Sequence, residues 1–405
     1  MTPWLSIIGI GEDGLAGLSD AARTLIAGAE LLVGGARHLA MVPPGRAERL
    51  AWERPLKATV ARIAARRGRP VAVLASGDPM CYGVGVTLAR RFDRAEMTIL
   101  PQLGAFSLAA ARLAWPLADC ETLTLHGRPL ERLLRHLAPD QRLLVLSEDG
   151  GTPAAIARLL CAAGWGPSRL AVLEHLGGAA EAVIEASAAD WGERRCADLN
   201  TVAILCRAGP EARILPRAAG LPDDAFLHDG QITKRELRAA TLAALAPLPG
   251  QLLWDVGAGC GSIAIEWLRA APRTAAIAIE RDAARRYLIA RNAAALGVPE
   301  LRIQGGEAPA ALAGLPQPQA VFLGGGIATA GLLDSLWDTL PAGGRLVANA
   351  VTLAGEAALA AFCERRGGAL TRIAVARAAP IGAQLAWRPL LPVTQLAATK
   401  PGAAA

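Results

Sequence analysis

The sequence predicts a two-part α/β protein, because short apolar runs alternate with helical patterns along most of its 405 residues. A chain of this length holds two to three domains at roughly 150 residues each. Residues 208–229 interrupt the alternation. They are rich in proline and glycine and show no sustained periodicity, which predicts a linker. We therefore expect one α/β domain over residues 1–207 and a second over residues 230–396.

In the first half, apolar runs predict the strands and capping residues mark the helices. The clearest helix has Thr152 as its N-cap, Pro153 at its first position and Gly164 just past its end. The step from Trp115 to Pro116 is expected to separate two lobes. Another helix covers residues 20–28, and the strands cover residues 5–9, 30–33, 71–75, 97–100, 121–125, 142–146, 171–174, 182–184 and 201–206.

After the linker, a second series of strands and helices begins. Residues 370–392 are typical of strands near the edge of a sheet, and we expect the tail from 397 to 405 to be frayed. The other expected strands are 251–256, 274–279, 301–304, 320–323 and 345–350, with helices over 263–270 and 282–296.

The basic residues are almost all arginine. The formal net charge is +6, and lysine occurs only at positions 57, 234 and 400 among 42 basic residues. A codon bias toward alanine, arginine and glycine explains this, and so does an anionic partner such as a nucleic acid or a polycarboxylate. The planar fork of arginine suits carboxylates, whereas the lack of a lysine-rich run disfavours a nucleic acid.

Several classes of protein are disfavoured by the composition. No uninterrupted apolar run reaches the ~18 residues of a transmembrane helix, so we expect no membrane partner. The N-terminus lacks the basic segment and cleavage site of a signal peptide. Seven cysteines are scattered without a CxxC pair, which predicts free thiols in the cytoplasm and neither a disulfide framework nor a zinc site.

The strongest motif lies in the second half, where an apolar strand runs into a glycine-rich turn and then a helix. Glycines let a ligand approach the backbone, and a helix N-terminus offers unpaired N–H donors. Alone, the pattern is equally typical of a tight turn. Glu280 ends the next strand, where an acid accepts hydrogen bonds from ribose hydroxyls. Together they predict a nucleoside site formed by Asp255, Gly257, Ala258, Gly259, Cys260, Gly261, Glu280, Gly306, Glu307 and Ala308.

The Gly-x-Gly-x-Gly spacing differs from the dinucleotide fingerprint and resembles the class I, Rossmann-like methyltransferases that bind S-adenosylmethionine. The segments WDVGAGCGS, AIERD, GGEAP, VFLGGG and RLVANAVTL resemble most closely the precorrin methyltransferases that act at carbon 15 and decarboxylate. Cys260 departs from that family, which usually carries threonine there. Thr233 begins a capping-box pattern, Thr-x-x-Glu, and the resemblance implies that it also contacts the cofactor.

The first half carries its own motif, a buried strand that runs into Gly77-Asp78-Pro79. Proline fixes one dihedral and glycine permits unusual ones, so backbone groups are held facing outward, although a simple turn has the same composition. With GIGEDG, LLVGG, LPQLGAFSLAAARL and LHGR, it resembles the class III tetrapyrrole methyltransferases, most of all those that methylate carbon 5. Their first turn is often Gly-x-Gly-Pro-Gly, from which Glu12-Asp13 departs. The resemblance implies two lobes with S-adenosylmethionine between them, held by Gly11, Ser76, Gly77, Asp78, Pro79, Ser107 and Leu108.

Three further residues are candidates for catalysis. His126 and Arg128 lie in an expected loop, where they can bind substrate carboxylates or move a proton, or simply form a solvated loop end. Asn349 is expected in a loop at a strand end, where ligands bind in α/β sheets, and a structural asparagine is the alternative. The other four histidines show no metal-ligand spacing, so we expect structural or surface roles for them and no metal site.

Two unrelated S-adenosylmethionine folds on one chain resemble the bifunctional precorrin methyltransferases of cobalamin synthesis. The resemblance implies two S-adenosylmethionine sites, a polycarboxylate tetrapyrrole substrate (precorrin-6B), methylation at carbons 5 and 15, loss of the carbon 12 acetate carboxylate, and a precorrin-8 as product. It also implies a homo-oligomer. One alternative is an RNA methyltransferase, which the sparse aromatics disfavour. The other is an enzyme for the cobalt-containing equivalent of the same substrate.

Overall fold

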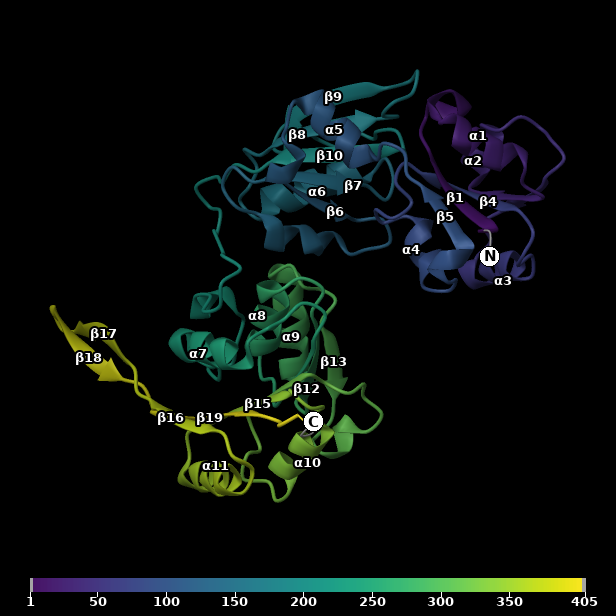
Figure 1. Cartoon of the computed structure of the whole chain (residues 1–405). Coiled ribbons are helices and arrows are strands. Elements are labelled where there is room, and N and C mark those ends of the chain that lie inside the picture. Colours follow the sequence, from purple (N-terminus) through teal and green to yellow (C-terminus); the bar gives the residue numbers. More distant parts are fainter. Residues whose placement is uncertain (1–2, 403–405) are drawn as a thin grey trace. The chain divides into compact units, whose positions relative to one another are not determined.

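The structure is a computed structural model that describes residues 3–402, and it divides into two compact units. The first unit comprises the described chain up to Arg128 together with Ala138–Arg213 (Figure 1). The second comprises Pro129–Leu137 and the chain from Ile214 on. No helix within residues 3–402 is long and apolar enough to cross a membrane.

The first lobe of the first unit is a parallel sheet with the strand order β3-β2-β4-β1-β5. Strands β1 and β4 are buried along almost their whole length, because an apolar cluster packs on each face of this sheet. The short edge strand β3 was not predicted. The strands are β1 (Leu5–Ile10), β2 (Leu31–Gly34), β3 (Glu48–Ala51), β4 (Val71–Ser76) and β5 (Met97–Leu100), with helices α1 (Asp20–Ala27), α2 (Ala36–Ala40), α3 (Leu56–Ala64) and α4 (Val84–Ala89).

The second lobe is a mixed sheet with the order β6-β7-β10-β8-β9. Helix α5 packs on it through Phe106, so the chain crosses between the lobes before this helix. The prediction of a crossing at Trp115–Pro116 was wrong, because the helix preceding that step already belongs to the second lobe. The elements are α5 (Ala105–Leu113), β6 (Cys120–Thr124), β7 (Arg142–Leu146), α6 (Thr152–Ala162), β8 (Arg169–Glu174), β9 (Ala182–Ser187) and β10 (Asn200–Leu205).

Helix α6 begins one residue earlier than predicted. Gly151 is its N-cap, Thr152 is the first residue of the helix, and Pro153 is the second. The Thr152 hydroxyl accepts hydrogen bonds from the backbone of Glu148 and Asp149, so it stabilises the preceding turn. A proline is compatible with either of the first helical positions, which is why the pattern does not fix the register.

The second unit is built on a seven-stranded sheet with the order β13-β12-β11-β14-β15-β19-β16. The five strands from β13 to β15 are parallel, and β19 and β16 extend the sheet antiparallel. The strands are β11 (Leu252–Val256), β12 (Ala275–Glu280), β13 (Arg302–Gly305), β14 (Ala320–Leu323), β15 (Arg345–Ala350), β16 (Ala369–Ile373) and β19 (Val393–Thr399), and the helices are α7 (Arg235–Leu245), α8 (Ser262–Ala270), α9 (Ala283–Ala295), α10 (Leu332–Thr339) and α11 (Leu353–Arg366).

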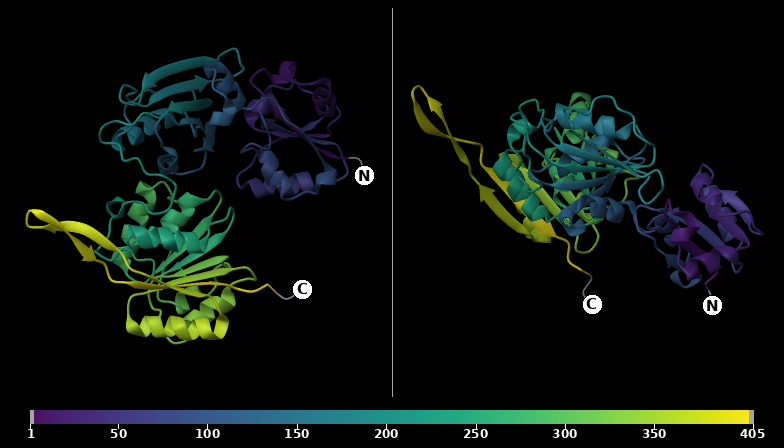
Figure 2. Two further views of the ribbon diagram at one scale, coloured as in Figure 1. Left: turned by 60° about the vertical axis from the view of Figure 1, so that its left-hand side comes forward. Right: turned by 90° about the horizontal axis from the view of Figure 1, so that it is seen from above.

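Two parts of the C-terminal region differ from expectation. Strands β17 (Ala376–Ile381) and β18 (Gln384–Pro389) form a separate hairpin that projects from the sheet as a yellow arm (Figure 2). The predicted frayed tail is wrong through residue 399, because β19 pairs with two strands and buries Leu396 completely. Lys400 then donates hydrogen bonds to three carbonyls at the end of α10. The rest of that prediction, residues 403–405, lies outside the described residues.

The expected linker is partly packed. From Ile214 on, the chain belongs to the second unit, and Leu221 and Phe226 are buried in its core. The backbone N–H groups of Gly220 and Leu221 donate to Glu266 on α8, at 2.7 and 3.0 Å. A proline- and glycine-rich stretch can therefore be ordered, because its backbone polar groups find buried partners.

Three loops of the first lobe meet backbone to backbone at the carboxyl ends of β1, β4 and β5. A Cβ at Gly9 would overlap the carbonyl oxygen of Gly77. A Cβ at Gly77 would lie 2.8 Å from the Cα of Gly104, and Gly77 also has a φ of +53°. Only glycine allows such an approach, so these positions fix the spacing of the loops that follow the strands.

We predict that Gly9→Ala destabilises the protein by about 1–3 kcal/mol or more, because the added methyl group must displace backbone atoms. Gly45→Ala is the matched control, since a Cβ there meets nothing within 4 Å. Urea unfolding of both variants checks the prediction. Equal free energies of unfolding for the two variants would contradict it.

Candidate functional site

The glycine-rich turn of the second unit connects β11 to α8. Gly257, Gly259 and Gly261 have φ values of +72°, +58° and +80°, a region that side chains rarely adopt. A Cβ at Gly261 would lie 3.0 Å from Ile289 of α9, and one at Gly257 would lie 3.0 Å from the backbone of Gly325. The loop thus packs closely between α9 and the backbone after β14, an approach that glycine allows.

The acid at the end of β12 holds the glycine loop. Glu280 is buried, and its carboxylate accepts hydrogen bonds from the backbone N–H groups of Gly259 at 2.8 Å and Asp282 at 3.0 Å. Each carboxylate oxygen keeps a second lone pair for a ligand hydroxyl. The position agrees with the predicted ribose contact, which the structure leaves as a prediction.

Asp255 is the most unusual ionisable group of this loop. It is buried, its Oδ2 accepts a hydrogen bond from Ala264 N at 3.0 Å, and its Oδ1 has no partner among the described residues. Burial, and to a lesser extent the nearby Glu280 charge, raise the pKa of Asp255 to about 7. A buried carboxylate oxygen without a donor beside a glycine cradle fits a cationic or N–H-bearing ligand group.

The segment before α7 lies over the glycine loop. The carbonyl of Gln231 is 3.9 Å from the position of a Cβ on Gly259, which places Thr233 close by. The predicted capping box is absent, because α7 begins at Arg235 with Lys234 as its N-cap, so Thr233 lies one residue before the cap. Its carbonyl oxygen instead accepts a hydrogen bond from Arg238.

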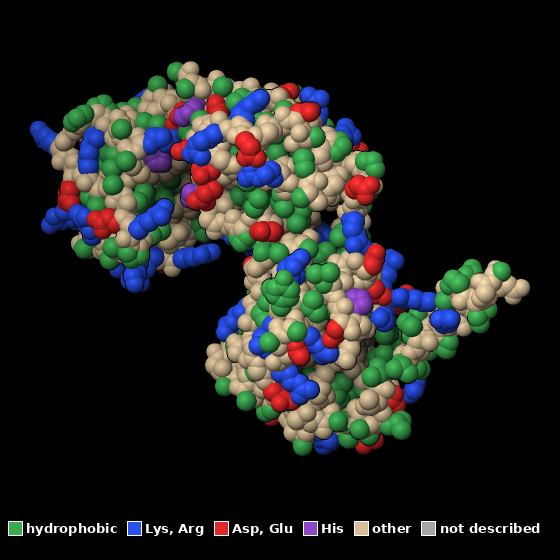
Figure 3. All heavy atoms as spheres, turned by 180° about the vertical axis from the view of Figure 1, so that it is seen from behind, with side chains coloured by type: hydrophobic (Ala, Val, Ile, Leu, Met, Phe, Trp, Pro, Cys, Tyr) green, Lys and Arg blue, Asp and Glu red, His purple; other side chains and the backbone are tan. Residues whose placement is uncertain are grey.

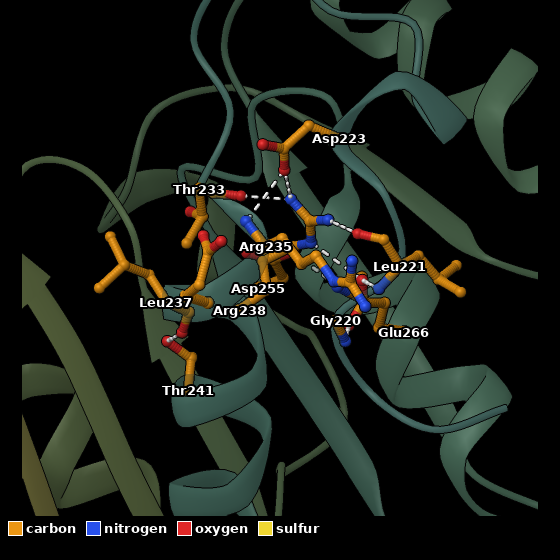
Figure 4. A network of polar contacts seen from close by, with 12 residues as sticks. Gly220, Leu221, Asp223, Thr233, Arg235, Leu237, Arg238, Thr241, Asp255 and Glu266 are labelled. Carbon is orange, nitrogen blue, oxygen red and sulfur yellow. Dashed lines mark hydrogen bonds and ion pairs between the residues drawn. The ribbon is translucent and has the colours of Figure 1, made fainter. Parts of the chain in front are cut away.

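Arg238 is a fully buried arginine that ties this segment to the core of the second unit (Figure 4). Its guanidinium forms ion pairs with Glu266 at 2.9 Å and Asp223 at 2.8 Å. It also donates to the carbonyl oxygens of Leu221 and Thr233. A buried arginine requires this degree of pairing, since each unpaired donor costs its full desolvation.

The network continues to the β17–β18 hairpin. Arg377 of β17 pairs with Asp223 at 2.9 Å and with Glu236 of α7 at 2.6 Å. Burial alone would raise the pKa of Asp223, but Arg238 and Arg377 hold it below its ordinary value. Asp223 therefore stays charged and joins the hairpin base to the segment that covers the glycine loop.

The remaining predicted contacts of the second unit lie around the same loop. Cys260 is buried, burial raises the pKa of its thiol, and its carbonyl accepts a hydrogen bond from Asn292 at 3.0 Å. Ala258 donates its N–H to the carbonyl of Ile279. The turn after β13 carries the last three predicted residues, Gly306, Glu307 and Ala308. Gly306 has a φ of +120°, and Glu307 is exposed and pairs with Arg281.

In the first unit, the Gly77-Asp78-Pro79 turn follows β4 directly. Asp78 Oδ1 accepts a hydrogen bond from Met80 N at 2.8 Å, which fixes the turn. A Cβ on Gly104 would lie 3.7 Å from the Asp78 backbone, so the turn touches the start of α5. The structure thereby brings Ser107 and Leu108 of α5 to the lobe boundary near Ser76, Gly77, Asp78 and Pro79, while Gly11 lies at the end of the neighbouring strand β1.

The three predicted catalytic residues lie in less distinctive surroundings. His126 is exposed, with its Nδ1 3.5 Å from Glu148, and it shares an open turn with Arg128. Asn349 lies within β15 and not in a loop, because β19 pairs alongside it and extends the strand. Its amide donates to Thr241 at 2.9 Å and accepts from Gln395 at 2.9 Å, contacts that a structural asparagine makes.

The sequence patterns missed a polar cluster at the strand ends of the first unit. Arg37 pairs with Glu12 and lies 3.2 Å from Ser76 Oγ and 3.0 Å from His38 Nε2. Burial, and then the Arg37 charge, lower the pKa of His38 to about 4, so this ring is neutral at pH 7. His175 Nδ1 lies 3.0 Å from the other Glu12 oxygen. Figure 3 shows histidine side chains beside basic and acidic ones around a hollow in this unit.

The only sequence signal for this cluster was the departure at Glu12 from the usual Gly-x-Gly-Pro-Gly turn. Arg37 and His38 follow β2 and His175 follows β8, so their meeting depends on the order of strands within two separate sheets. Spacing along the chain contains no such information.

Both halves of the chain are similar to known protein families. A family model described as tetrapyrrole (corrin/porphyrin) methylases matches residues 5–191, and one described as a precorrin methyltransferase domain matches residues 224–400. A Precorrin-6Y C(5,15)-methyltransferase [decarboxylating] of Sinorhizobium sp is 53% identical over 403 residues, which cover 99% of this chain and 97% of that protein.

Shorter relatives match about two fifths of the chain each. A Cobalt-precorrin-7 C(5)-methyltransferase of Salmonella typhimurium is 33% identical over 172 residues, 42% of this chain and 85% of that protein. A Probable cobalt-precorrin-6B C(15)-methyltransferase (decarboxylating) of Pyrobaculum aerophilum is 32% identical over 181 residues, 43% of this chain and 92% of that protein.

We predict that Asp255→Asn changes the pH dependence of stability. Because the folded-state pKa of Asp255 lies above its ordinary value, its stabilising contribution is complete below about pH 4 and is lost as pH rises to about 7. Relative to the wild type, the asparagine variant should gain about 2–3 kcal/mol between pH 5 and pH 8. Denaturant unfolding at the two pH values measures this, and a pH-independent difference between the two proteins would contradict it.

Proposed function

This chain belongs to the family of decarboxylating precorrin-6Y C(5,15)-methyltransferases, and we infer from this membership how its two units divide the reaction. It is an S-adenosylmethionine-dependent methyltransferase of cobalamin biosynthesis that methylates carbons 5 and 15 of its precorrin substrate and removes a carboxyl group. The identity extends over nearly the whole of both chains, and this observation carries the assignment. It favours a tetrapyrrole over the RNA substrate that the basic composition left open.

We propose two S-adenosylmethionine sites, one in each unit. When bound, the cofactor supplies an electrophilic methyl group on a sulfonium. In the second unit, Gly257, Gly259 and Gly261 form a cradle that a Cβ would fill, and Asp255 offers an unpartnered carboxylate oxygen. In the first unit, the Gly77-Asp78-Pro79 turn and the start of α5 hold backbone groups at the lobe boundary. Both sets of residues fit a nucleoside carrying a charged amino acid.

The first unit is proposed to methylate carbon 5, and the second to methylate carbon 15 and release carbon dioxide. The family models support this division, because the tetrapyrrole methylase model covers residues 5–191 and the precorrin methyltransferase model covers 224–400. The two short relatives support it as well, because each activity exists as a protein of about half this length. The sequence-based domain limits 1–207 and 230–396 remain a proposal.

The proposed decarboxylation needs little chemistry from the protein. Loss of carbon dioxide from an acetate leaves an electron pair, which a neighbouring imine of the conjugated substrate can delocalise. The residues of the second unit then have to orient the acetate and exclude water from it. Arginine side chains at each site are proposed to hold the other carboxylates through paired hydrogen bonds. Asn349, His126 and Arg128 remain candidate contacts.

We also propose that the chain works as a homo-oligomer in the cytoplasm. The β17–β18 hairpin supports self-association, because it projects from the unit and exposes Leu385, Trp387 and Ile381 (Figure 2). Seven unpaired cysteines agree with a reducing compartment.

The two-site proposal predicts a stoichiometry near two for S-adenosylhomocysteine in titration calorimetry. Asp78→Arg should abolish binding at the first unit alone, and Gly259→Arg at the second alone, since each places a long cation in one cradle. In assays with the precorrin substrate, Asp78→Arg should lose methylation at carbon 5. Gly259→Arg should lose methylation at carbon 15 together with carbon dioxide release.

Product analysis by mass spectrometry separates these outcomes. A single binding site in the wild type, or loss of both sites in either variant, would refute the two-site proposal. Carbon dioxide release by Gly259→Arg but not by Asp78→Arg would reverse the assignment of decarboxylation.

The proposed self-association predicts that Trp387→Glu lowers the molar mass of the full chain in light scattering, because a charge on the hairpin opposes burial. Leu353→Glu is the matched control, since Leu353 is even more exposed than Trp387 but lies at the start of α11. An oligomer that tolerates Trp387→Glu, or a monomeric wild type, would contradict the role of the hairpin.

A further inference from the structure

The turn that follows β8 in the first unit carries a histidine with one engaged and one free nitrogen. His175 Nδ1 lies 3.0 Å from Glu12 Oε2, and within residues 3–402 no group bonds its Nε2. About a third of the His175 side chain is exposed, whereas Glu12 is largely covered. His175 is therefore the more exposed member of the pair.

The contacts of Glu12 determine which nitrogen carries the proton. A carboxylate accepts hydrogen bonds only, so the neutral His175 ring donates its Nδ1–H to Glu12 and keeps the lone pair on Nε2. Arg37 pairs with the other oxygen of Glu12 and is in turn held by Ser76 and His38. Arg37, Ser76 and His38 thus fix the orientation of the Glu12 carboxylate that holds the His175 ring.

The backbone of His175 is held in an uncommon conformation. Its φ is +47°, in the left-handed region that non-glycine residues rarely adopt. The backbone N–H donates to Leu199 O at 3.1 Å, and the carbonyl accepts from Gly178 N at 2.9 Å, so both ends of the residue are fixed. Such strained residues concentrate at functional sites, where the surrounding structure maintains them.

The same turn touches the predicted methyl-donor side of the first unit. A Cβ on Gly177 would lie 3.5 Å from Leu108 Cδ1 of α5, and one on Gly178 would lie 2.7 Å from Glu12 Cβ. The turn is therefore wedged between the loop after β1 and the helix that follows the Gly104 turn. His175 thus begins a turn that packs against the helix carrying Ser107 and Leu108.

We propose that His175 is the catalytic base of carbon 5 methylation, with Glu12 as its positioning residue. The proposal rests on the assignment of carbon 5 to the first unit. A bridging carbon of a tetrapyrrole carries a hydrogen, and replacing this hydrogen with a methyl group releases a proton. Nε2 of His175 is an acceptor whose ring is oriented by Glu12.

An electron pair of the conjugated substrate forms the bond from carbon 5 to the methyl group, and the pair of the broken carbon–sulfur bond stays on sulfur. Carbon 5 then carries both a methyl group and a hydrogen, and the ring system is a cation. His175 Nε2 takes the proton from carbon 5, and the pair of the broken C–H bond restores the conjugation. The Glu12 carboxylate stabilises the resulting imidazolium.

The test uses the full chain with precorrin-6B (also called precorrin-6Y) and S-adenosylmethionine. Methylation at carbon 5 and at carbon 15 is followed separately by NMR of the labelled products. His175→Gly should slow methylation at carbon 5 by about 100-fold or more, the typical contribution of a general base. Carbon 15 is the internal control and should react at the wild-type rate. Affinity for S-adenosylhomocysteine should be unchanged in calorimetry. The melting temperature should change little, because the relief of the positive φ offsets the lost hydrogen bond to Glu12.

Two further variants sharpen the test. Free imidazole should restore part of the carbon 5 rate in His175→Gly, where the side chain has left a space. His175→Asn keeps a donor for Glu12 and tolerates the same φ, but it lacks the acceptor nitrogen and fills that space. It should be as slow as His175→Gly and should not respond to imidazole. Glu12→Gln should lower kcat for carbon 5 and leave KM unchanged.

Three results would overturn the proposal. In the first, His175→Gly methylates carbon 5 at the wild-type rate. In the second, the variant loses affinity for S-adenosylhomocysteine in proportion to its rate, which would make His175 a support of the cofactor site. In the third, the wild-type chain methylates carbon 15 but never carbon 5, which would remove the function proposed for the first unit and the role of His175 with it.

Discussion

The packing of the segment that covers the glycine loop of the second unit depends on one buried guanidinium, that of Arg238. Arg238 is surrounded by two carboxylates, two backbone carbonyls and the ring of Phe226, whose centroid lies 4.8 Å from the guanidinium carbon. Losing one partner of such a group typically costs about 3–5 kcal/mol, because a buried charge is left uncompensated. The segment from Leu221 to Thr233 has little regular structure of its own, so this network holds it over the glycine loop. The base of the hairpin is attached to the same point through Asp223 and Arg377.

The two units expose backbone at their proposed cofactor sites by different means. The second unit does so with three glycines of positive φ in one loop between β11 and α8. The first unit brings together glycines from three separate strand ends, of which Gly77 alone has a positive φ. The first arrangement is visible as a motif because its parts are adjacent in the chain. The second depends on the strand order β4-β1-β5, which places distant glycines in contact.

This difference explains how much the sequence could predict. The α/β class, most strands and the residues of both turns follow from local periodicity and glycine spacing. The capping box at Thr233 failed by one residue, because α7 begins at Arg235 and the acid that the box needs, Glu236, pairs with Arg377 instead. Residues 397–399, the end of β19, looked like a tail, since their pairing comes from β15 and β16 and not from a long apolar run of their own. Arg238 and His175 could not be singled out at all, because an arginine in a helix and a histidine in a loop are ordinary until their partners are known.

The proton balance of the two proposed reactions explains why a base matters most in the first unit. Methylation of a bridging carbon releases one proton. Decarboxylation of an acetate to a methyl group consumes one, because the carbanion that is left must be protonated. In the second unit, methylation at carbon 15 and loss of carbon dioxide therefore cancel, and the substrate can supply the proton that it later takes up. Methylation at carbon 5 has no such partner reaction, so its proton has to be taken up by a base outside the substrate. We propose that the Glu12–His175 pair, held at Nδ1 and with Nε2 left as an acceptor, meets that need.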